Sequence, residues 1–122
     1  MEEEGCVTLE EARGLVASSR RILVVSGSGI SASAGLSTYV NGGGVYERAR
    51  KRYKLAKGIE LFNWSFYEER PRESQAFLAQ LAGAVAGCEP TATHRSIVAL
   101  ERAGTLVRHV TMNIDSLHSA AG

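Results

Sequence analysis

The sequence predicts an α/β protein built on a Rossmann-like, three-layer parallel sheet, of which this chain supplies only a part. Two short apolar runs, Ile22–Val25 and Thr105–Val110, have the composition of strands, and a long segment separates them. Parallel strands need such a crossover connection, whereas antiparallel strands can be joined by a tight turn. Ile22–Val25 is apolar at every position, which is typical of a strand that is covered on both faces.

Helix signals lie before and between the two strands. Thr8 and Glu11 have the spacing of a capping box, in which each side chain bonds the backbone of the other residue. Pro71 and Pro90 are placed to begin or end a helix, and Gly104 is placed to end one. The predicted helices are Thr8–Ser19, a short one around 31–34, one on each side of Pro71, and one from Thr91 to about Ala103, with a loop at Asn41–Gly44.

Length, composition and charge limit the classes of function. A chain of 122 residues and 13.1 kDa forms one small domain with little room for a separate substrate domain. Its net charge of +1 predicts no general attraction to nucleic acid or to anionic membranes. The acidic start Met1–Glu4 is unlike a targeting presequence, and no apolar stretch is long enough to span a membrane. We therefore expect a cytoplasmic or nuclear protein with no nucleic-acid or membrane partner.

Two cysteines and a basic segment add weaker signals. Cys6 and Cys88 are too few and too far apart for a zinc cluster, so we expect free thiols and no metal site. The basic residues between Arg48 and Lys57 fit either a site for an acidic partner or a solvated helix face. The near-neutral total charge favours the solvated face.

A glycine-rich turn follows the first predicted strand directly. In Gly27-Ser28-Gly29 the glycines allow backbone N–H groups to approach an anion closely, and a helix that begins there adds its dipole. This arrangement is typical of a phosphate-binding turn. The same tripeptide also serves as an ordinary tight turn, and its spacing alone does not separate the two interpretations.

The segment that follows the second predicted strand carries a carboxamide and a carboxylate. Asn113 and Asp115 lie two residues apart at the carboxyl end of the strand, and Asp115 is the only aspartate in the chain. Ligands of open parallel sheets bind at this edge, where both side chains can hydrogen-bond a sugar or an amide. The alternative is that the two residues cap the turn or the short helix that follows at Ser116–His118.

Taken together, these segments resemble the sirtuins, the NAD-dependent protein-lysine deacylases. Gly27–Ser31 and Gly35–Val40 are similar to the family's Gly-Ala-Gly-Ile-Ser and Gly-Ile-Pro-Asp-Phe-Arg signature. Thr111–His118, followed by Ala121-Gly122, is similar to its Thr-Gln-Asn-Ile-Asp-x-Leu-His block. The resemblance extends from about Leu15 to Gly122. It implies that residues 1–122 form a partial NAD-binding domain, about half of a sirtuin catalytic domain and without its zinc module.

The resemblance implies NAD as the cofactor. Gly27, Ser28 and Gly29 would lie against the pyrophosphate. Thr38 and Tyr39 would belong to the loop that closes over the nicotinamide ribose, and Asp115 would recognise the carboxamide. The expected cofactor-binding residues are Gly27, Ser28, Gly29, Ile30, Ser31, Gly35, Thr38, Tyr39, Asn113, Ile114 and Asp115.

The family reaction moves an acyl group from a protein lysine to ADP-ribose and releases nicotinamide, so an acyl-lysine protein is the implied substrate. Tyr67 and Arg70 match the Tyr-x-x-Arg pair of sirtuins that remove acidic acyl groups, and one helical turn separates them. The alternative is that Tyr67 faces the core and that Arg70 pairs with Glu73.

Several positions depart from the sirtuin pattern. Val40 replaces an arginine, Met112 replaces a glutamine, and no residue of the chain matches the family's general-base histidine or its zinc ligands. We therefore assign no catalytic residue. We expect a chain that is marginally stable, associates with itself through an exposed sheet edge, or is a fragment of a longer gene product. The alternatives are a non-catalytic nucleotide-binding or interaction protein and an unrelated small Rossmann-like module.

Overall fold

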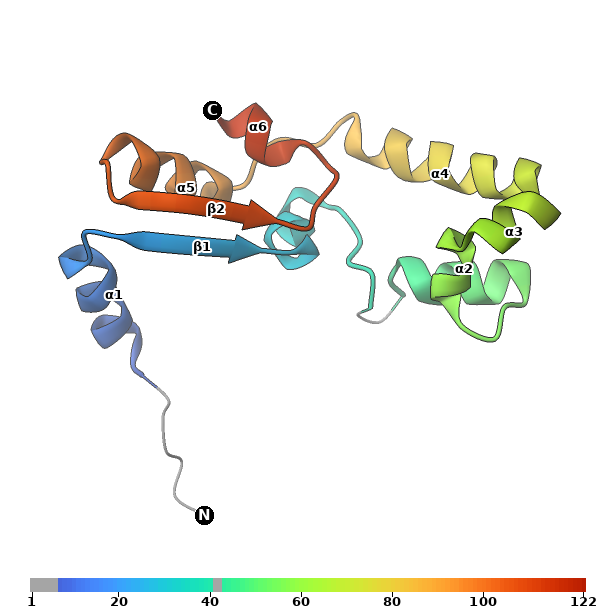
Figure 1. Cartoon of the computed structure of the whole chain (residues 1–122), viewed down its shortest axis with the longest axis horizontal. Helices are drawn as coiled ribbons and strands as arrows, with labels where there is room; N and C mark the ends of the chain where they lie inside the picture. The colour runs from blue at the N-terminus through green and yellow to red at the C-terminus, as the bar shows by residue number, and fades with distance from the viewer. Residues whose placement is uncertain (1–6, 41–42) are drawn as a thin grey trace, which may run out of the picture.

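A computed structural model of the chain describes residues 7–40 and 43–122. Figure 1 shows an elongated molecule, with a small sheet and its helices at one end and a group of helices at the other. The elements are α1 (Leu9–Ser18), β1 (Ile22–Ser26), the 3₁₀ helix η1 (Ser28–Ala34), α2 (Val45–Tyr53), the 3₁₀ helix η2 (Gly58–Phe62), α3 (Trp64–Glu69), α4 (Pro71–Val85), α5 (Ala92–Arg102), β2 (Leu106–Thr111) and α6 (Leu117–Ala121).

The sheet confirms the predicted parallel pairing of the two strands. Val24 lies beside His109 and Ser26 beside Thr111, so both strands end at the same edge. The connection between them contains all the helices from η1 to α5, and α5 packs against both β2 and α6. The loops that follow β1 and β2 therefore meet at one end of the sheet, as Figure 1 shows.

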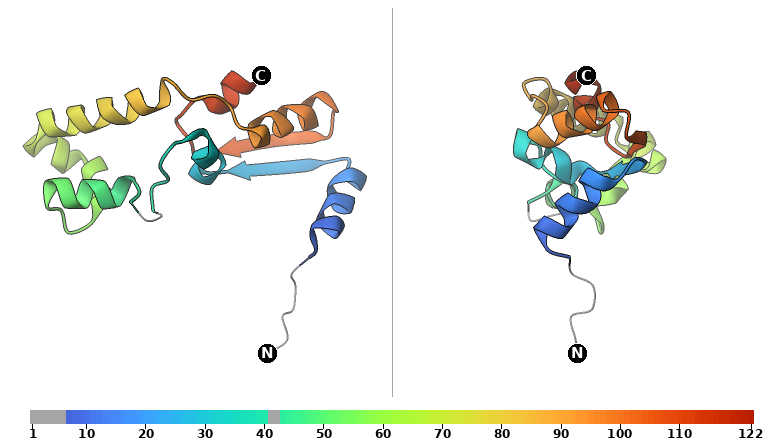
Figure 2. Two further views of the ribbon diagram at one scale, coloured as in Figure 1. Left: turned by 180° about the vertical axis from the view of Figure 1, so that it is seen from behind. Right: turned by 90° about the vertical axis from the view of Figure 1, so that its left-hand side faces the viewer.

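One face of the sheet is exposed. Leu23 and Val25 of β1 are 62% and 69% exposed, and Val110 of β2, which lies beside Val25, is also exposed. The expectation of a strand covered on both faces is therefore wrong for the described residues. Helix α1 does not supply a cover, because none of its residues is buried and it extends away from the start of β1 in both views of Figure 2.

The main apolar core lies away from the sheet, among α2, η2, α3 and α4, which we call the helical lobe. Tyr53 makes edge contacts with the rings of Phe66 and Phe77, with centroids 5.6 and 5.8 Å away. The buried apolar side chains of this core are Val45, Ala49, Tyr53, Leu61, Phe66 and Phe77. The α2 helix therefore buries one stripe in the lobe, while its basic residues point outward.

A close backbone contact fixes the lobe. At Gly58, the first residue of η2, a Cβ atom would lie 1.8 Å from the carbonyl oxygen of Tyr46 in α2. No other residue type fits there without displacing backbone, so glycine allows η2 to approach α2.

The helix ends confirm several sequence signals. Thr8 and Glu11 form the predicted capping box of α1, and Pro71 is the first residue of α4. Thr91 caps α5 together with His94, whose side chain completes a second capping box. The short helix predicted around 31–34 begins three residues earlier, at Ser28, and is a 3₁₀ helix.

Three smaller expectations concern the loop, the cysteines and membrane spans. Asn41 and Gly42 of the predicted loop, and Cys6, lie outside the described residues. Cys88 is a free thiol whose Sγ donates to the carbonyl oxygen of Ala84 at 3.2 Å. Within the described parts of the chain, no helix has the length and apolar character that crossing a membrane requires.

Candidate functional site

A cavity of about 340 Å³ lies where the loops after β1 and β2 meet the helical lobe. Its volume is at the lower end of the range of small-molecule sites. One wall is polar and comes from η1 and the loop after β2, while the other is largely apolar and comes from α2, η2 and α4. The lining residues that the argument below uses are Ser28, Ser31, Tyr39, Arg48, Asn113 and Asp115.

A hydrogen-bond network builds the polar wall. The Ser31 hydroxyl, only 1% exposed, donates to Oδ2 of Asp115 at 2.6 Å. Nδ2 of Asn113 donates to the carbonyl oxygen of Gly27 at 3.1 Å and lies 3.5 Å from Oγ of Ser31. The structure therefore brings Asn113 and Asp115 to Ser31 and the glycine turn, from which the sequence separates them by more than 80 residues.

The second carboxylate oxygen of Asp115 has a different partner. Oδ1 accepts the backbone N–H of Leu117 at 3.0 Å, at the start of α6. The capping role that the sequence left open is therefore present as well. Ser116, between the two residues, has a φ of 60°, which places a non-glycine residue in the left-handed region directly beside the site.

The glycine turn is held from two sides. The carbonyl oxygen of Gly27 accepts both the Asn113 side chain and the N–H of Ile30, and the Thr91 hydroxyl donates to the carbonyl of Ile30. A Cβ added at Gly27 or Gly29 would meet nothing within 4 Å. A side chain at either glycine would thus meet no obstacle, and hydrogen bonds from Asn113 and Thr91 fix the backbone of the turn.

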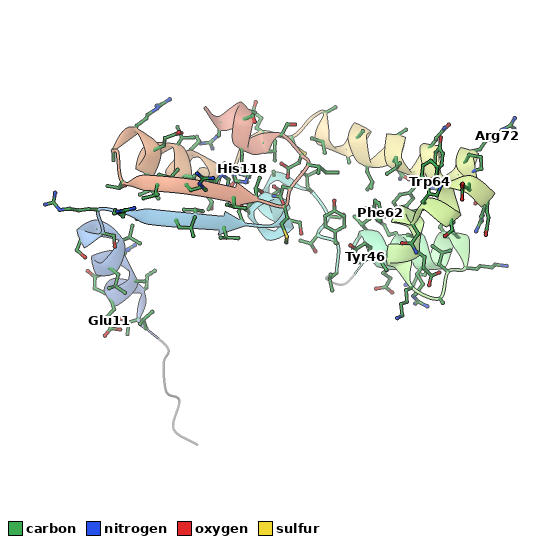
Figure 3. All side chains as sticks on the ribbon, viewed as in Figure 1. Glu11, Tyr46, Phe62, Trp64, Arg72 and His118 are labelled. Atoms are coloured by element: carbon green, nitrogen blue, oxygen red, sulfur yellow. The ribbon has the colours of Figure 1, made fainter. Side chains whose placement is uncertain are left out.

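Thr38 and Tyr39 connect the cavity to the helical lobe. Their carbonyl oxygens accept the N–H groups of Val45 and Tyr46, the first residues of α2, at 3.0 and 3.1 Å. The Tyr39 ring contacts the rings of Tyr46 and Phe62, with centroids 5.4 and 6.3 Å away. Figure 3 shows Tyr46 and Phe62 on the side of the lobe that faces the sheet.

The predicted cofactor residues divide into two groups. Those that line the cavity are Ser28, Ser31, Gly35, Tyr39, Asn113, Ile114 and Asp115. Gly27, Gly29, Ile30 and Thr38 are not among the lining residues, and three of these four contribute the backbone hydrogen bonds given above. Val40 and Met112, which depart from the sirtuin pattern, are 78% and 81% exposed and do not line the cavity.

Tyr67 and Arg70 lie elsewhere, on and directly after α3. Arg70 forms an ion pair with Glu73, and its Nη1 donates to the carbonyl oxygen of Tyr53 at 3.1 Å. The Glu73 contact raises the pKa of the Arg70 guanidinium. The Tyr67 ring stacks on Trp64 with centroids 5.2 Å apart. Neither Tyr67 nor Arg70 lines the cavity.

Sequence reasoning missed a histidine cluster beside the site. The His118 ring lies between His94 and His109, with ring centroids 4.6 and 4.1 Å away. Nε2 of both His109 and His118 lies within hydrogen-bond distance of the Ser26 hydroxyl, at 2.8 and 3.0 Å. A hydroxyl has one hydrogen, so one of these rings donates to Ser26 and the other accepts from it. The predicted strand pairing was the only signal that could have placed Ser26 near His109.

Burial and charge both act on this cluster. Burial, followed by the neighbouring His109 and His94, lowers the pKa of His118 below its ordinary value, and Asp115 opposes the change. His94 is fully buried, and Nδ1 accepts the N–H of Thr91, so the ring proton is on Nε2. That Nε2 has no hydrogen-bond partner among the described residues. The described part of the chain contains no group of three or more potential ligands arranged for a metal ion.

A parallel α/β sheet whose two strand-end loops border a cavity of ligand size defines a Rossmann-like class of protein. A sequence profile of the Sir2 family matches residues 27–122. The chain therefore belongs to the Sir2 family, which confirms the resemblance to sirtuins.

Curated relatives and solved structures agree with this assignment. The chain is 33% identical over 115 residues to an NAD-dependent deacetylase of Dictyostelium discoideum, covering 94% of this chain and 21% of the relative. It is 32% identical to an NAD-dependent protein deacylase of Thermococcus sibiricus, covering 93% and 42%. A Sir2 homologue solved with ADP-ribose superposes with a TM-score of 0.80 at 28% identity, over 94% of this chain and 43% of the other. One solved with NAD gives 0.78 at 25%, over 99% and 44%. The chain spans less than half the length of each of these proteins.

Proposed function

We propose that this chain binds NAD, or its ADP-ribose part, in the cavity between the strand-end loops. The observation that carries the proposal is the buried Ser31–Asp115 hydrogen bond, which joins the glycine turn region to the loop after β2 at the cavity wall. Relatives of similar sequence are named as NAD-dependent enzymes, and two structural neighbours were solved with NAD and ADP-ribose.

The residues at the cavity fit the chemistry of this cofactor. Ser28, in the middle of the glycine turn, lines the cavity, and the backbone of this turn suits a diphosphate. Asn113 and Asp115 offer a carboxamide and a carboxylate, which suit ribose hydroxyls and the nicotinamide amide. The apolar wall of α4, which includes Leu78 and Leu81, would exclude water from one side of the ligand.

Bound NAD supplies a nicotinamide leaving group on the ribose carbon that an acyl-lysine oxygen attacks in the family reaction. In this chain, Asp115 would accept a hydrogen bond from the nicotinamide amide and hold its orientation. Ser31 would hold Asp115, and Tyr39 would close the side of the cavity toward the helical lobe. We assign no proton transfer to any residue of the chain.

We further propose that the chain is a part of an NAD-binding domain of sirtuin type, spanning residues 1–122, whose complete form acts on acyl-lysine proteins. The relatives' names support this, since they include an NAD-dependent protein deacylase. The alternative is a non-catalytic nucleotide-binding or interaction protein. Nicotinamide release separates the two functions.

Tyr67 and Arg70 stay a prediction for acidic acyl groups. In the structure Arg70 pairs with Glu73, as one part of the alternative expected, whereas Tyr67 stacks on the exposed ring of Trp64. An acidic acyl chain would have to replace Glu73 as the partner of Arg70. Self-association also stays a prediction, and the exposed apolar face at Leu23 and Val25 supports it.

Isothermal calorimetry of the 122-residue chain with NAD, ADP-ribose and adenosine tests the binding. We expect NAD and ADP-ribose to bind, and Asp115→Ala to weaken NAD more than ADP-ribose, because only NAD carries the amide. Absence of heat at millimolar ligand would refute the proposal. A second assay measures nicotinamide release from NAD with an acetylated peptide: release supports deacylation, whereas binding without release supports the non-catalytic alternative.

A further inference from the structure

The charge balance of the cavity identifies one residue that the sequence comparison did not. A dinucleotide such as NAD brings two negative charges on its diphosphate, and among the described residues the only charged ones that line the cavity are Asp115 and Arg48. Asp115 is acidic and already accepts two hydrogen bonds. A positive charge for the diphosphate must therefore come from Arg48 or from outside the lining residues.

The α2 helix places Arg48 at the cavity. Val45 and Ala49, on either side of it in the sequence, are 3% and 0% exposed in the core of the helical lobe, so they fix the orientation of α2. The carbonyls of Thr38 and Tyr39 hold the first turn of the same helix against the cavity wall. Arg48, one turn into α2, is exposed and lines both this cavity and the adjoining hollow formed with Lys51, Arg52, Phe77 and Gln80.

Two neighbouring cations of α2 have partners, whereas Arg48 and Arg50 have none among the residues that the structure describes; of these two arginines, Arg48 lines the cavity and Arg50 does not. Lys51 pairs with Glu47 at 2.8 Å, and Nη1 of Arg52 donates to the side-chain oxygen of Gln80 at 3.1 Å. The Arg48 guanidinium makes no hydrogen bond or ion pair with any of the residues from 7–40 and 43–122. Its five N–H donors are thus available to a ligand in the cavity.

We propose that Arg48 is the residue that pairs with the diphosphate of the bound nucleotide. This assignment rests on the proposed function and adds the residue that distinguishes a diphosphate from an uncharged nucleoside. A planar guanidinium presents a rigid fork of N–H donors that can bond two phosphate oxygens at once, whereas a lysine ammonium acts as a point charge without that fixed geometry. On the basic face of α2, Arg48 would then contact the ligand, while the other basic residues face solvent.

The test compares Arg48→Ala with Arg50→Ala, since Arg50 is an exposed arginine of the same helix that lines neither hollow. The two variants have the same net charge. Calorimetry of the full chain with ADP-ribose, ADP and adenosine is expected to show a five- to tenfold loss, roughly, for the two diphosphates in Arg48→Ala. Arg50→Ala should bind like the unsubstituted chain, adenosine should bind all three proteins equally, and Arg48→Lys should recover part of the loss.

The outcomes separate this assignment from the proposed function. If the unsubstituted chain binds ADP-ribose and Arg48→Ala binds it equally well, Arg48 is only a solvated charge and the assignment is wrong while NAD binding stands. Equal losses in Arg48→Ala and Arg50→Ala also overturn it, because they indicate a general field of the helix. If the unsubstituted chain binds no nucleotide, both proposals fail. A near-ultraviolet circular dichroism spectrum, unchanged in each variant, shows that the fold is intact.

Discussion

The hydroxyl of Ser31 donates a hydrogen bond of 2.6 Å to the carboxylate of Asp115, although the two residues are 84 positions apart. Ser31 belongs to η1 and Asp115 to the loop after β2, so this bond fixes the distance between the two segments that form the polar wall of the cavity. The hydroxyl is buried, and water cannot readily replace it. Parallel strand pairing brings the two loops to one edge, and this bond sets their final positions.

Replacing Ser31 by alanine tests this relationship. The variant leaves Oδ2 of Asp115 without its partner, and we expect the free energy of unfolding to fall by about 1 to 3 kcal/mol. Nucleotide binding should weaken as well, because Asp115 loses its orientation. Ser33→Ala is the matched control, since Ser33 lies in the same 3₁₀ helix, is exposed and makes no side-chain hydrogen bond to the described residues. Urea unfolding followed by circular dichroism measures the free energy of unfolding of both variants. Equal effects of the two substitutions would contradict the prediction.

Gly58 gives a test of the helical lobe. A Cβ at this position would lie 1.8 Å from the backbone oxygen of Tyr46, so Gly58→Ala must push η2 away from α2. We expect a loss of about 3 kcal/mol in the free energy of unfolding. Gly83→Ala in α4 is expected to have the opposite effect on stability. Its Cβ would meet nothing within 4 Å, and a glycine inside a helix lowers the stability of that helix relative to alanine. That variant should gain about 0.5 to 1 kcal/mol. Thermal melts of the pair distinguish the two outcomes, and a destabilised Gly83→Ala would count against the described packing.

The histidine cluster predicts a pH dependence of stability. Burial, together with His109 and His94, lowers the folded-state pKa of His118 below the ordinary value of 6.5, although Asp115 raises it in part. The unfolded chain therefore binds the proton at a higher pH than the folded chain does. The contribution of His118 to stability is complete above about pH 6.5 and is lost as the pH falls through the folded-state pKa.

Urea midpoints measured between pH 5 and pH 8 check this direction. His118→Asn removes the titrating group, so its midpoint should change less over this range than that of the unsubstituted chain. Glu11 and Glu47 do not contribute to the change between pH 5 and pH 8, because hydrogen bonds from Thr8 and Lys51 respectively lower their pKa values below 4.5. Both carboxylates therefore titrate at lower pH. A stability that rises as the pH falls from 7 to 5 would exclude the prediction.

Much of the fold and of the candidate site could be predicted because the signals are local. The capping box at Thr8, the proline that begins α4 and the β-branched strand runs each specify their own element within a few residues. The parallel pairing followed from the order of elements. The polar site residues after each strand then followed from that pairing, since parallel strands bring their carboxyl ends together.

The remaining features depend on distances between segments that no local pattern encodes. The Ser26 hydroxyl meets His109 and His118 because of the strand register and the direction of α6, and no spacing in the sequence indicates either. Arg48 looked like one of several solvated cations until the position of α2 placed it at the cavity. The apolar run of β1 indicated cover on both faces. An apolar strand is suited to burial, but its composition does not specify which element covers it.

The exposed face of the sheet predicts that the chain associates with itself. Leu23 and Val25 point to the same side of β1, and each strand of a two-stranded sheet has an unpaired edge that a second copy can extend. We expect the average mass in sedimentation equilibrium to rise with concentration, and the double variant Leu23→Lys/Val25→Lys to remain monomeric. Val16→Lys is the control, since Val16 is 52% exposed and belongs to α1, the helix that extends away from the sheet in Figure 1. If Val16→Lys abolishes association equally, the contact is non-specific, and a mass independent of concentration in the unsubstituted chain rejects self-association.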